Sequence, residues 1–282
     1  MFSMNEVPKN PNTMNYNLNP FVDAVTQTLD LSDVLTINAM GMENIVLPFL
    51  ERNPTIRYLR CHDRWLGDET ALVLAEGLAS NTNIVSLSLS HCHIGIQGTL
   101  AIASLKNIRK LALSGNEINH DVIRAIRFNS NIRELWISSC GLGAYDAYQI
   151  SRNKNIILLD IGHNPIGDLG AKAIASMSNL KTCLLSCNNM GEEGAKALVA
   201  NIECKILNFD GNTEGKKILN EDDPIKRANY GRERGMAAVP SLASMSIFTV
   251  KNVDVSSLSS TQLNKLRNQY AALPDQVKHQ LI

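Results

Sequence analysis

One pattern of apolar residues recurs along this chain at a fixed interval, and it restricts the possible folds more than any other feature. Its clearest copy runs from Ile156 to Asn179 and reads IILLDIGHNPIGDLGAKAIASMSN. The first half has apolar residues at nearly alternate positions, which is typical of a short strand. The second half has the spacing of an amphipathic helix. A unit this short cannot bury its own apolar side, so it needs neighbours of the same kind.

Seven further copies of this frame follow the same register. They begin at Ser32, Ile56, Ile84, Ile108, Ile132, Leu180 and Cys204, so the intervals are 24, 28 and then 24 residues throughout. The fourth position of the frame holds Leu35, Leu59, Leu87, Leu111, Leu135, Leu159, Cys183 and Leu207. The ninth position is Asn in four copies, and we expect these amides to bond to the backbone of a turn because buried amides need partners. They are Asn116, Asn164, Asn188 and Asn212.

The combined pattern, LxxLxLxx(N/C)xL, resembles that of leucine-rich repeats. The helical halves GDLGAKAIASM and GEEGAKALVAN are similar to those of the ribonuclease-inhibitor and GALA subclasses. This resemblance implies an α/β fold, a horseshoe-shaped solenoid with a parallel β-sheet on its concave face and helices on its convex face. It also implies that positions 2, 3, 5, 7 and 8 of each repeat point into the concave side.

The segments on either side of the repeats predict caps, which solenoid ends require. Residues 1–19 are rich in Asn and Pro and are predicted to be disordered. Residues 20–31 are predicted to form an N-terminal helical cap, with Asn19 before Pro20 at the first helical position. Eight repeats are predicted over residues 32–213. Residues 214–235 form a charged linker or irregular cap, and residues 236–282 a helical C-terminal cap.

Composition narrows the classes of partner. Lys plus Arg equals Asp plus Glu at 27 each, so no global charge indicates nucleic acid or an anionic membrane. No stretch has the length and apolarity of a membrane span, and the N-terminus lacks a Sec-type signal. Five of the six cysteines occupy inward-facing frame positions, and no spacing fits a zinc site. We therefore expect a reduced, cytoplasmic monomer without metal or cofactor.

A candidate binding site centres on Trp136, at the middle of one concave strand. Apolar neighbours on the following strands surround it, and charged residues form a rim, which is the usual composition of an interface hot spot. The alternative is that a C-terminal segment covers these residues or that they are scattered apolar surface. The predicted set comprises Ile157, Leu158 and Leu184 as apolar neighbours, Arg133, Glu134 and Asp160 at the rim, and His163 beside them.

A second candidate cluster lies near the N-terminal end. Tyr58, Arg60 and His62 share one predicted strand with Arg57 and Asp63. Arg and Tyr are favoured at interfaces. The alternative is a solvated strand with internal ion pairs, which contribute little.

Catalysis requires a nucleophile beside a base, and one pair of residues fits that spacing. Cys187 and His163 hold the same frame position on neighbouring strands. No third group follows from the pattern, so we predict no catalytic residues.

The favoured function is a non-enzymatic module that binds a folded protein on its concave face. The resemblance to ribonuclease inhibitor implies that binding can block a partner enzyme's active site. GALA-type repeats also resemble those of effectors that bacteria inject into host cells, so the partner would be a host protein or another effector.

A different function would follow from residues 241–250, SLASMSIFTV, which resemble an elongin-binding box. With the helical hairpin predicted after it, the segment is similar to a SOCS-type box. The chain would then be a ubiquitin-ligase substrate receptor. The same residues also fit an apolar helix that caps the last repeat.

Overall fold

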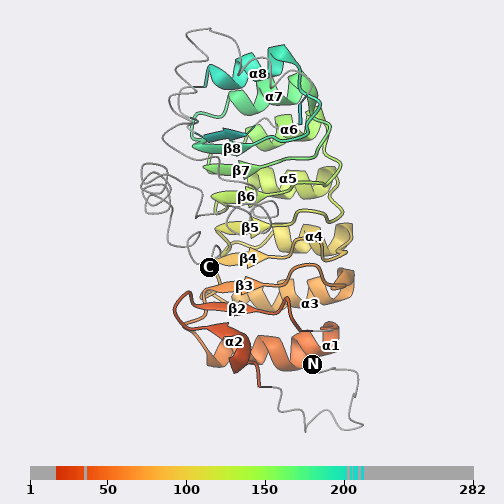
Figure 1. The fold of residues 1–282 in the computed structure, drawn as a ribbon. Coiled ribbons are helices and arrows are strands. Elements are labelled where there is room, and N and C mark those ends of the chain that lie inside the picture. The colour runs from red at the N-terminus through yellow and green to blue at the C-terminus, as the bar shows by residue number, and fades with distance from the viewer. Residues whose placement is uncertain (1–16, 35–36, 202–203, 205, 209–210, 213–282) are drawn as a thin grey trace, which may run out of the picture.

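The computed structural model describes residues 17–34, 37–201, 204, 206–208 and 211–212, which form a solenoid of stacked strand–helix turns (Figure 1). One sheet contains all nine strands in sequence order. The strands are β1 (Val22–Asp23), β2 (Thr28–Asp30), β3 (Tyr58–Arg60), β4 (Ser86–Ser88), β5 (Lys110–Ala112), β6 (Glu134–Trp136), β7 (Leu158–Asp160), β8 (Thr182–Leu184) and β9 (Ile206–Asn208). The helices are α1 (Ala39–Gly41), α2 (Leu47–Arg52), α3 (Gly67–Ser80), α4 (Ile96–Ala103), α5 (His120–Phe128), α6 (Ala144–Ser151), α7 (Gly167–Ala175) and α8 (Glu192–Val199).

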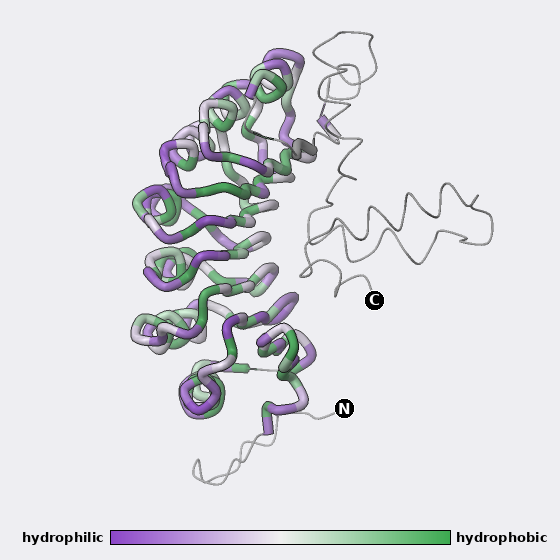
Figure 2. Tube along the Cα trace, turned by 90° about the vertical axis from the view of Figure 1, so that its left-hand side faces the viewer, coloured by the Kyte–Doolittle hydropathy of each residue, from purple (hydrophilic) through white to green (hydrophobic). Residues whose placement is uncertain are grey.

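The strands β2 to β9 are parallel, and the predicted frame sets their register from the second repeat onward. Leu59 lies beside Leu87, Leu87 beside Leu111, and the fourth frame positions continue in line to Cys183 and Leu207. This confirms the α/β solenoid and its parallel sheet. Strands run along one side of the stack and helices along the other (Figure 2).

The core lies between the strands and the helices. The fourth and sixth frame positions are buried throughout repeats two to seven, as are inward-facing helix residues such as Ile123, Ile150 and Ile174. Because each repeat contributes the same few positions, the core is continuous along the solenoid.

Asparagine side chains hold the turns that follow the strands. The Asn164 carbonyl oxygen accepts from the N–H groups of Cys140 and Leu142, both at 3.0 Å, so it satisfies the turn of the preceding repeat. Its amide nitrogen donates to three backbone carbonyls, including that of Ile137. Asn116 and Asn212 bond in the same way. The predicted structural role of these residues is confirmed.

The eighth frame position of every complete turn adopts a left-handed backbone, with φ between 53° and 73°. The sequence pattern does not predict this, since the residues there include Asp, His, Ser and Cys as well as Gly. They are Asp63, His91, Gly115, Ser139, His163, Cys187 and Gly211.

The first repeat corrects the predicted frame. Its strand is β2, and Leu29 lies beside Leu59, so it begins six residues before the predicted position and Leu35 is not its central residue. The apolar residues on both sides of Ser32 fit the frame, but only the earlier set pairs with β3. The convex part is then helical from Ala39 to Arg52, with a π-helical segment (η3, Met42–Val46) before Pro48, which cannot donate a backbone hydrogen bond.

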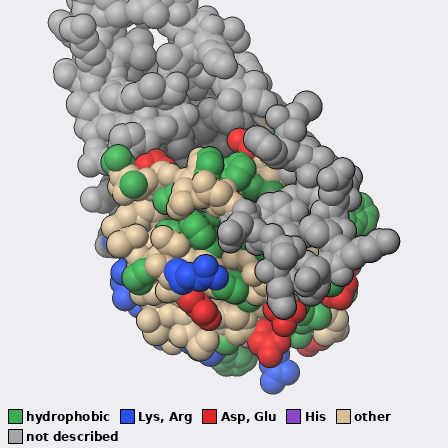
Figure 3. Space-filling view, turned by 90° about the horizontal axis from the view of Figure 1, so that it is seen from below, with side chains coloured by type: hydrophobic (Ala, Val, Ile, Leu, Met, Phe, Trp, Pro, Cys, Tyr) green, Lys and Arg blue, Asp and Glu red, His purple; other side chains and the backbone are tan. Residues whose placement is uncertain are grey.

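The helix predicted over residues 20–31 is also wrong. Asn19–Phe21 form a single 3₁₀ turn, and β1 then pairs antiparallel with β2, Val22 beside Leu29. Asp23 bonds the N–H groups of Val25 and Thr26, which makes a hairpin turn and leaves β2 covered by a short strand. Seen from this end, apolar side chains and several charged ones lie among backbone and other uncharged side chains (Figure 3).

Several predictions fall outside the described residues. These are most of the N-terminal stretch at residues 1–19, the segment at 214–235, the C-terminal cap at 236–282, and the elongin-box resemblance within it.

Candidate functional site

The sheet brings the residues of the first candidate site together. Trp136 lies beside Asp160 and Asp160 beside Leu184, on the neighbouring strands β6, β7 and β8. Glu134 and Leu158 form the adjacent pair on the same face. The predicted neighbourhood of Trp136 therefore exists on the concave side of the sheet.

Solvent exposure within this group differs from the prediction. Trp136 and Leu158 are half-buried, and Ile157 is 40% exposed. Asp160 and Leu184 are only 2% and 3% exposed, so the expectation that Asp160 is an exposed rim charge and Leu184 an exposed apolar neighbour of Trp136 is wrong. The accessible apolar surface consists of Trp136, Leu158 and Ile157.

Asp160 is buried because its carboxylate serves the protein's own backbone and side chains. One carboxylate oxygen accepts from the N–H of Gly162 at 3.0 Å, and the Ser138 hydroxyl also bonds to it. Burial raises the pKa of Asp160 above its usual 3.8, while these hydrogen bonds and nearby His163 partly oppose that rise. The Asp160 carboxylate therefore fixes the turn that follows β7 and is not a rim charge.

Charged groups remain on the side of the site toward β5. Lys110 and Glu134 form an ion pair at 2.9 Å across β5 and β6, with each side chain about a quarter exposed. The guanidinium of Arg133 donates to the carbonyl of Ser130 at 2.8 Å. His163 is exposed in the turn that follows β7.

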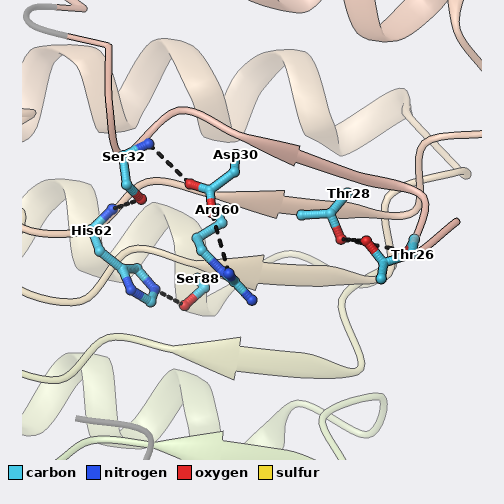
Figure 4. A network of polar contacts seen from close by, with 7 residues as sticks. All are labelled: Thr26, Thr28, Asp30, Ser32, Arg60, His62 and Ser88. Carbon is cyan, nitrogen blue, oxygen red and sulfur yellow. Dashed lines mark hydrogen bonds and ion pairs between the residues drawn. The ribbon is translucent and has the colours of Figure 1, made fainter. Parts of the chain in front are cut away.

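The second cluster is a polar network across the first strands (Figure 4). Arg60 and Asp30 form an ion pair at 3.2 Å, with each side chain a little over a third exposed. The N–H of His62 donates to the Ser32 hydroxyl at 3.0 Å, and the imidazole Nε2 bonds the Ser88 hydroxyl. Burial, and then the charge of Arg60, lower the pKa of His62 from its usual 6.5. Tyr58 is half-buried beside them on β3.

The Cys187 thiol lies over Gly211 of the next turn, where a Cβ would collide with the sulfur. That direction is away from the turn of His163. Within the part of the chain that the structure describes, Cys187 forms no hydrogen bond with His163.

Two aromatic groups were missed by sequence reasoning. Trp65 is 75% exposed and stacks on His93 with ring centroids 4.5 Å apart, in the turns after β3 and β4. Both residues hold the tenth frame position, where the repeat pattern allows any residue, so the pattern does not single them out. The one available signal in the sequence was a Trp at a turn position that is expected to be exposed. The second group, Phe128, Tyr145 and Tyr148, lies exposed on α5 and α6.

The described residues contain neither a membrane-spanning helix nor a metal-binding cluster. None of their helices combines the length and apolarity needed to cross a membrane. No group of three or more His, Cys, Asp or Glu side chains among them is arranged to hold a metal ion.

The comparison with protein-family models agrees with the repeated strand–helix unit. The model of the family described as "Leucine Rich repeat" matches residues 80–103, 152–175 and 178–199. Among solved structures, internalin C2 from Listeria monocytogenes is similar, with 19% identity over 65% of this chain and 80% of that chain and a TM-score of 0.45. No curated protein matches this chain.

Proposed function

We propose that this chain, whose repeats match the model of the leucine-rich repeat family over residues 80–103, 152–175 and 178–199, is a non-enzymatic module that binds a folded protein on the concave face of its sheet. Solenoid repeats of this kind generally mediate protein–protein interaction through an extended concave surface. Eight parallel strands spaced about 4.8 Å apart give an inner arc of roughly 35 Å, which suits a protein surface better than a metabolite.

One observation carries the proposal: Trp136 on β6, Leu158 on β7 and Ile157 just before β7 form an accessible apolar group. A half-buried Trp is held in place by its strand neighbours, so it loses little side-chain entropy when a partner covers it. The Lys110–Glu134 ion pair lies on its β5 side and provides a polar margin. An aromatic centre with a polar margin is how binding hot spots are built.

The polar network around Arg60 and His62 provides a second contact region. It lies three strand spacings from Trp136, about 14 Å away along the sheet. The strands between them carry small or short residues on the same row, Ser88 on β4 and Ala112 on β5. A partner that contacts both regions would therefore pass over the small side chains of Ser88 and Ala112 between them.

The mode of action is a finer part of this proposal. The helical halves resemble those of ribonuclease inhibitor, which supports inhibition by covering a partner enzyme's active site. The GALA-like repeats support an effector that acts as a monomer inside a host cell, on a host protein or another effector.

The experiment is a pull-down that compares the wild type with the Trp136→Ala, Leu158→Ala double variant. Leu72→Ala on the convex helix α3 is the matched control, because Leu72 is 43% exposed and lies off the sheet. We expect the wild type and the control to retain the same protein, and the double variant to lose it. With that protein purified, Trp136→Ala should weaken binding by about 2 kcal/mol, roughly thirtyfold in Kd.

An unchanged affinity of Trp136→Ala, with its unfolding midpoint also unchanged, would overturn this location. A variant that lost binding only because it unfolded would be recognised by circular dichroism, and Leu158→Ala alone would then replace it.

A further inference from the structure

The convex face carries an aromatic and basic surface that the proposed function does not use. It lies on α5 and α6, which stack side by side on the helical side of the solenoid (Figure 1). We call it the α5–α6 ridge, and it consists of Arg124, Arg127, Phe128, Tyr145, Tyr148 and Arg152.

The ridge aromatics are not required by the core. Phe128, Tyr145 and Tyr148 are 64%, 59% and 46% exposed, whereas the inward faces of both helices are already filled by residues such as Ile126 and Ile150. The frame position of Phe128 holds exposed Ser104 and Ser176 in other repeats. Large exposed aromatics on neighbouring helices are typical of interaction surfaces.

Contacts between the two helices fix the ridge at both ends. At the first turns, His120 packs edge-on against Tyr145 with ring centroids 5.5 Å apart, and its Nδ1 lies 2.7 Å from the Asp146 carboxylate. At the last turns, the Arg127 guanidinium donates to the Gln149 side chain at 2.6 Å. The surface is therefore ordered before a partner arrives, which lowers the entropy cost of binding.

The arginines of the ridge lie against its rings. The Arg127 guanidinium carbon is 4.9 Å from the centre of the Phe128 ring, and that of Arg152 is 5.7 Å from the centre of the Tyr148 ring. Arg152 also donates to the Tyr148 hydroxyl at 3.0 Å. Stacking on an aromatic ring leaves the edge of a guanidinium free to bond further acceptors.

The positive charge of the ridge is not neutralised within the described part of the chain. There, Arg124, Arg127 and Arg152 form no ion pair with a carboxylate. By contrast, Lys172 on α7 pairs with Glu193 at 3.3 Å, and Lys196 on α8 pairs with Glu192 at 2.6 Å. The lysines of the neighbouring helices are compensated, and the arginines of the ridge are not.

We propose that the α5–α6 ridge is a second binding surface, which takes an acidic segment of another protein. Carboxylates of that segment bond the guanidinium groups of Arg124 and Arg152, which offer paired donors in a fixed plane. Apolar side chains between the carboxylates pack on Phe128 and Tyr148. The ridge faces away from the sheet, so both surfaces can be occupied at once and the chain can connect two proteins.

A fluorescein-labelled peptide in which Glu alternates with Leu is the probe, and fluorescence anisotropy measures its binding to the full chain. We expect the wild type to bind it, and the same peptide with Gln in place of Glu to bind at least roughly tenfold more weakly. Arg124→Ala with Arg152→Ala should weaken binding of the Glu peptide roughly tenfold, since two exposed ion pairs are lost. Phe128→Ala with Tyr148→Ala should weaken it by at least as much.

The matched control is Lys172→Ala with Lys196→Ala, which removes the same charge from α7 and α8. It should bind like the wild type, and so should Trp136→Ala, because the concave site is separate. Failure of the wild type to bind the Glu peptide, equal binding of the Gln peptide, or an equal loss in the lysine control would overturn the proposal. Self-association of the chain that Phe128→Ala abolishes would also overturn it, by assigning the ridge to a second copy.

Discussion

Replacing Asn164 with Ala should destabilise the protein more than the same change at any surface amide. Asn164 is 1% exposed and forms five hydrogen bonds with the backbone of its own and the preceding repeat. Alanine would leave the N–H groups of Cys140 and Leu142 buried without an acceptor. Each such group costs about 1–3 kcal/mol, so we expect a loss of about 4 kcal/mol in the free energy of unfolding.

Asn188 is a matched control one repeat further along the chain. Its amide nitrogen donates to Ile161 and Ser186 at 3.2 and 3.1 Å, but its buried carbonyl oxygen has no hydrogen-bond partner. In the preceding turn, the N–H of Ile166 donates to the backbone carbonyl of Asn164 at 2.8 Å instead of to the Asn188 side chain. Asn188→Ala therefore leaves no buried N–H group without an acceptor, and it should lower the free energy of unfolding by about 1–2 kcal/mol.

Urea unfolding followed by circular dichroism measures both losses on the same scale. The two substitutions remove the same volume, so the cavity contribution largely cancels in the difference. We expect Asn164→Ala to be less stable than Asn188→Ala by about 2 kcal/mol or more. Equal losses, or a loss below about 1 kcal/mol at Asn164, would contradict a role of the Asn164 amide oxygen in stabilising the turn.

Two further substitutions test local features of the fold. The pKa of Asp160 is raised in the folded state, so ionisation of this carboxyl lowers the stability of the protein as pH rises through that pKa. Asp160→Asn should therefore raise the melting temperature near neutral pH, and this gain should vanish as pH falls toward 3.8. Thermal melts of both proteins at several pH values measure the difference. Gly115 has φ +68°, and a Cβ added there would collide with the His91 ring. Gly115→Ala should therefore lower the free energy of unfolding by about 1–2 kcal/mol. Urea unfolding of the double variant should show that His91→Ala restores part of this loss.

The sequence predicts the repeats from Ile84 onward because each copy repeats the same apolar positions at a constant interval. Strand pairing then follows, since one register alone places Leu87, Leu111 and Leu135 in one buried row. The same approach places the strand of the first repeat wrongly. Leu29 and Leu31 fit the frame as well as Leu35 and Ile37, and the choice depends on pairing with β3, which local spacing does not contain.

The N-terminal hairpin escaped prediction for a related reason. Asn19 and Pro20 are good helix-start residues, but the segment also lies at the open edge of β2. Covering that edge satisfies backbone groups that a helix there would leave unpaired. The decisive interaction is between segments, so propensity alone gives the wrong element.

The candidate site was predicted in position but not in exposure. The frame places Trp136, Leu158 and Asp160 on the concave face, and the structure agrees. It cannot reveal that the Asp160 carboxylate bonds Ser138 and Gly162 and is buried, because this depends on side-chain direction. Sequence analysis missed the α5–α6 ridge because the repeat pattern specifies only the helix positions that face inward. An aromatic residue at an outward-facing position therefore does not depart from the pattern.

The most direct test of the concave binding surface uses the protein's two tryptophans. Hydroxyl-radical footprinting with mass spectrometry measures the oxidation of each, with and without the partner that the pull-down identifies. Trp65 is 75% exposed in a turn outside the proposed contact and serves as the internal reference. We expect partner binding to protect Trp136 and to leave the oxidation of Trp65 unchanged. Protection of Trp65 with Trp136 oxidised as in the free protein would contradict it.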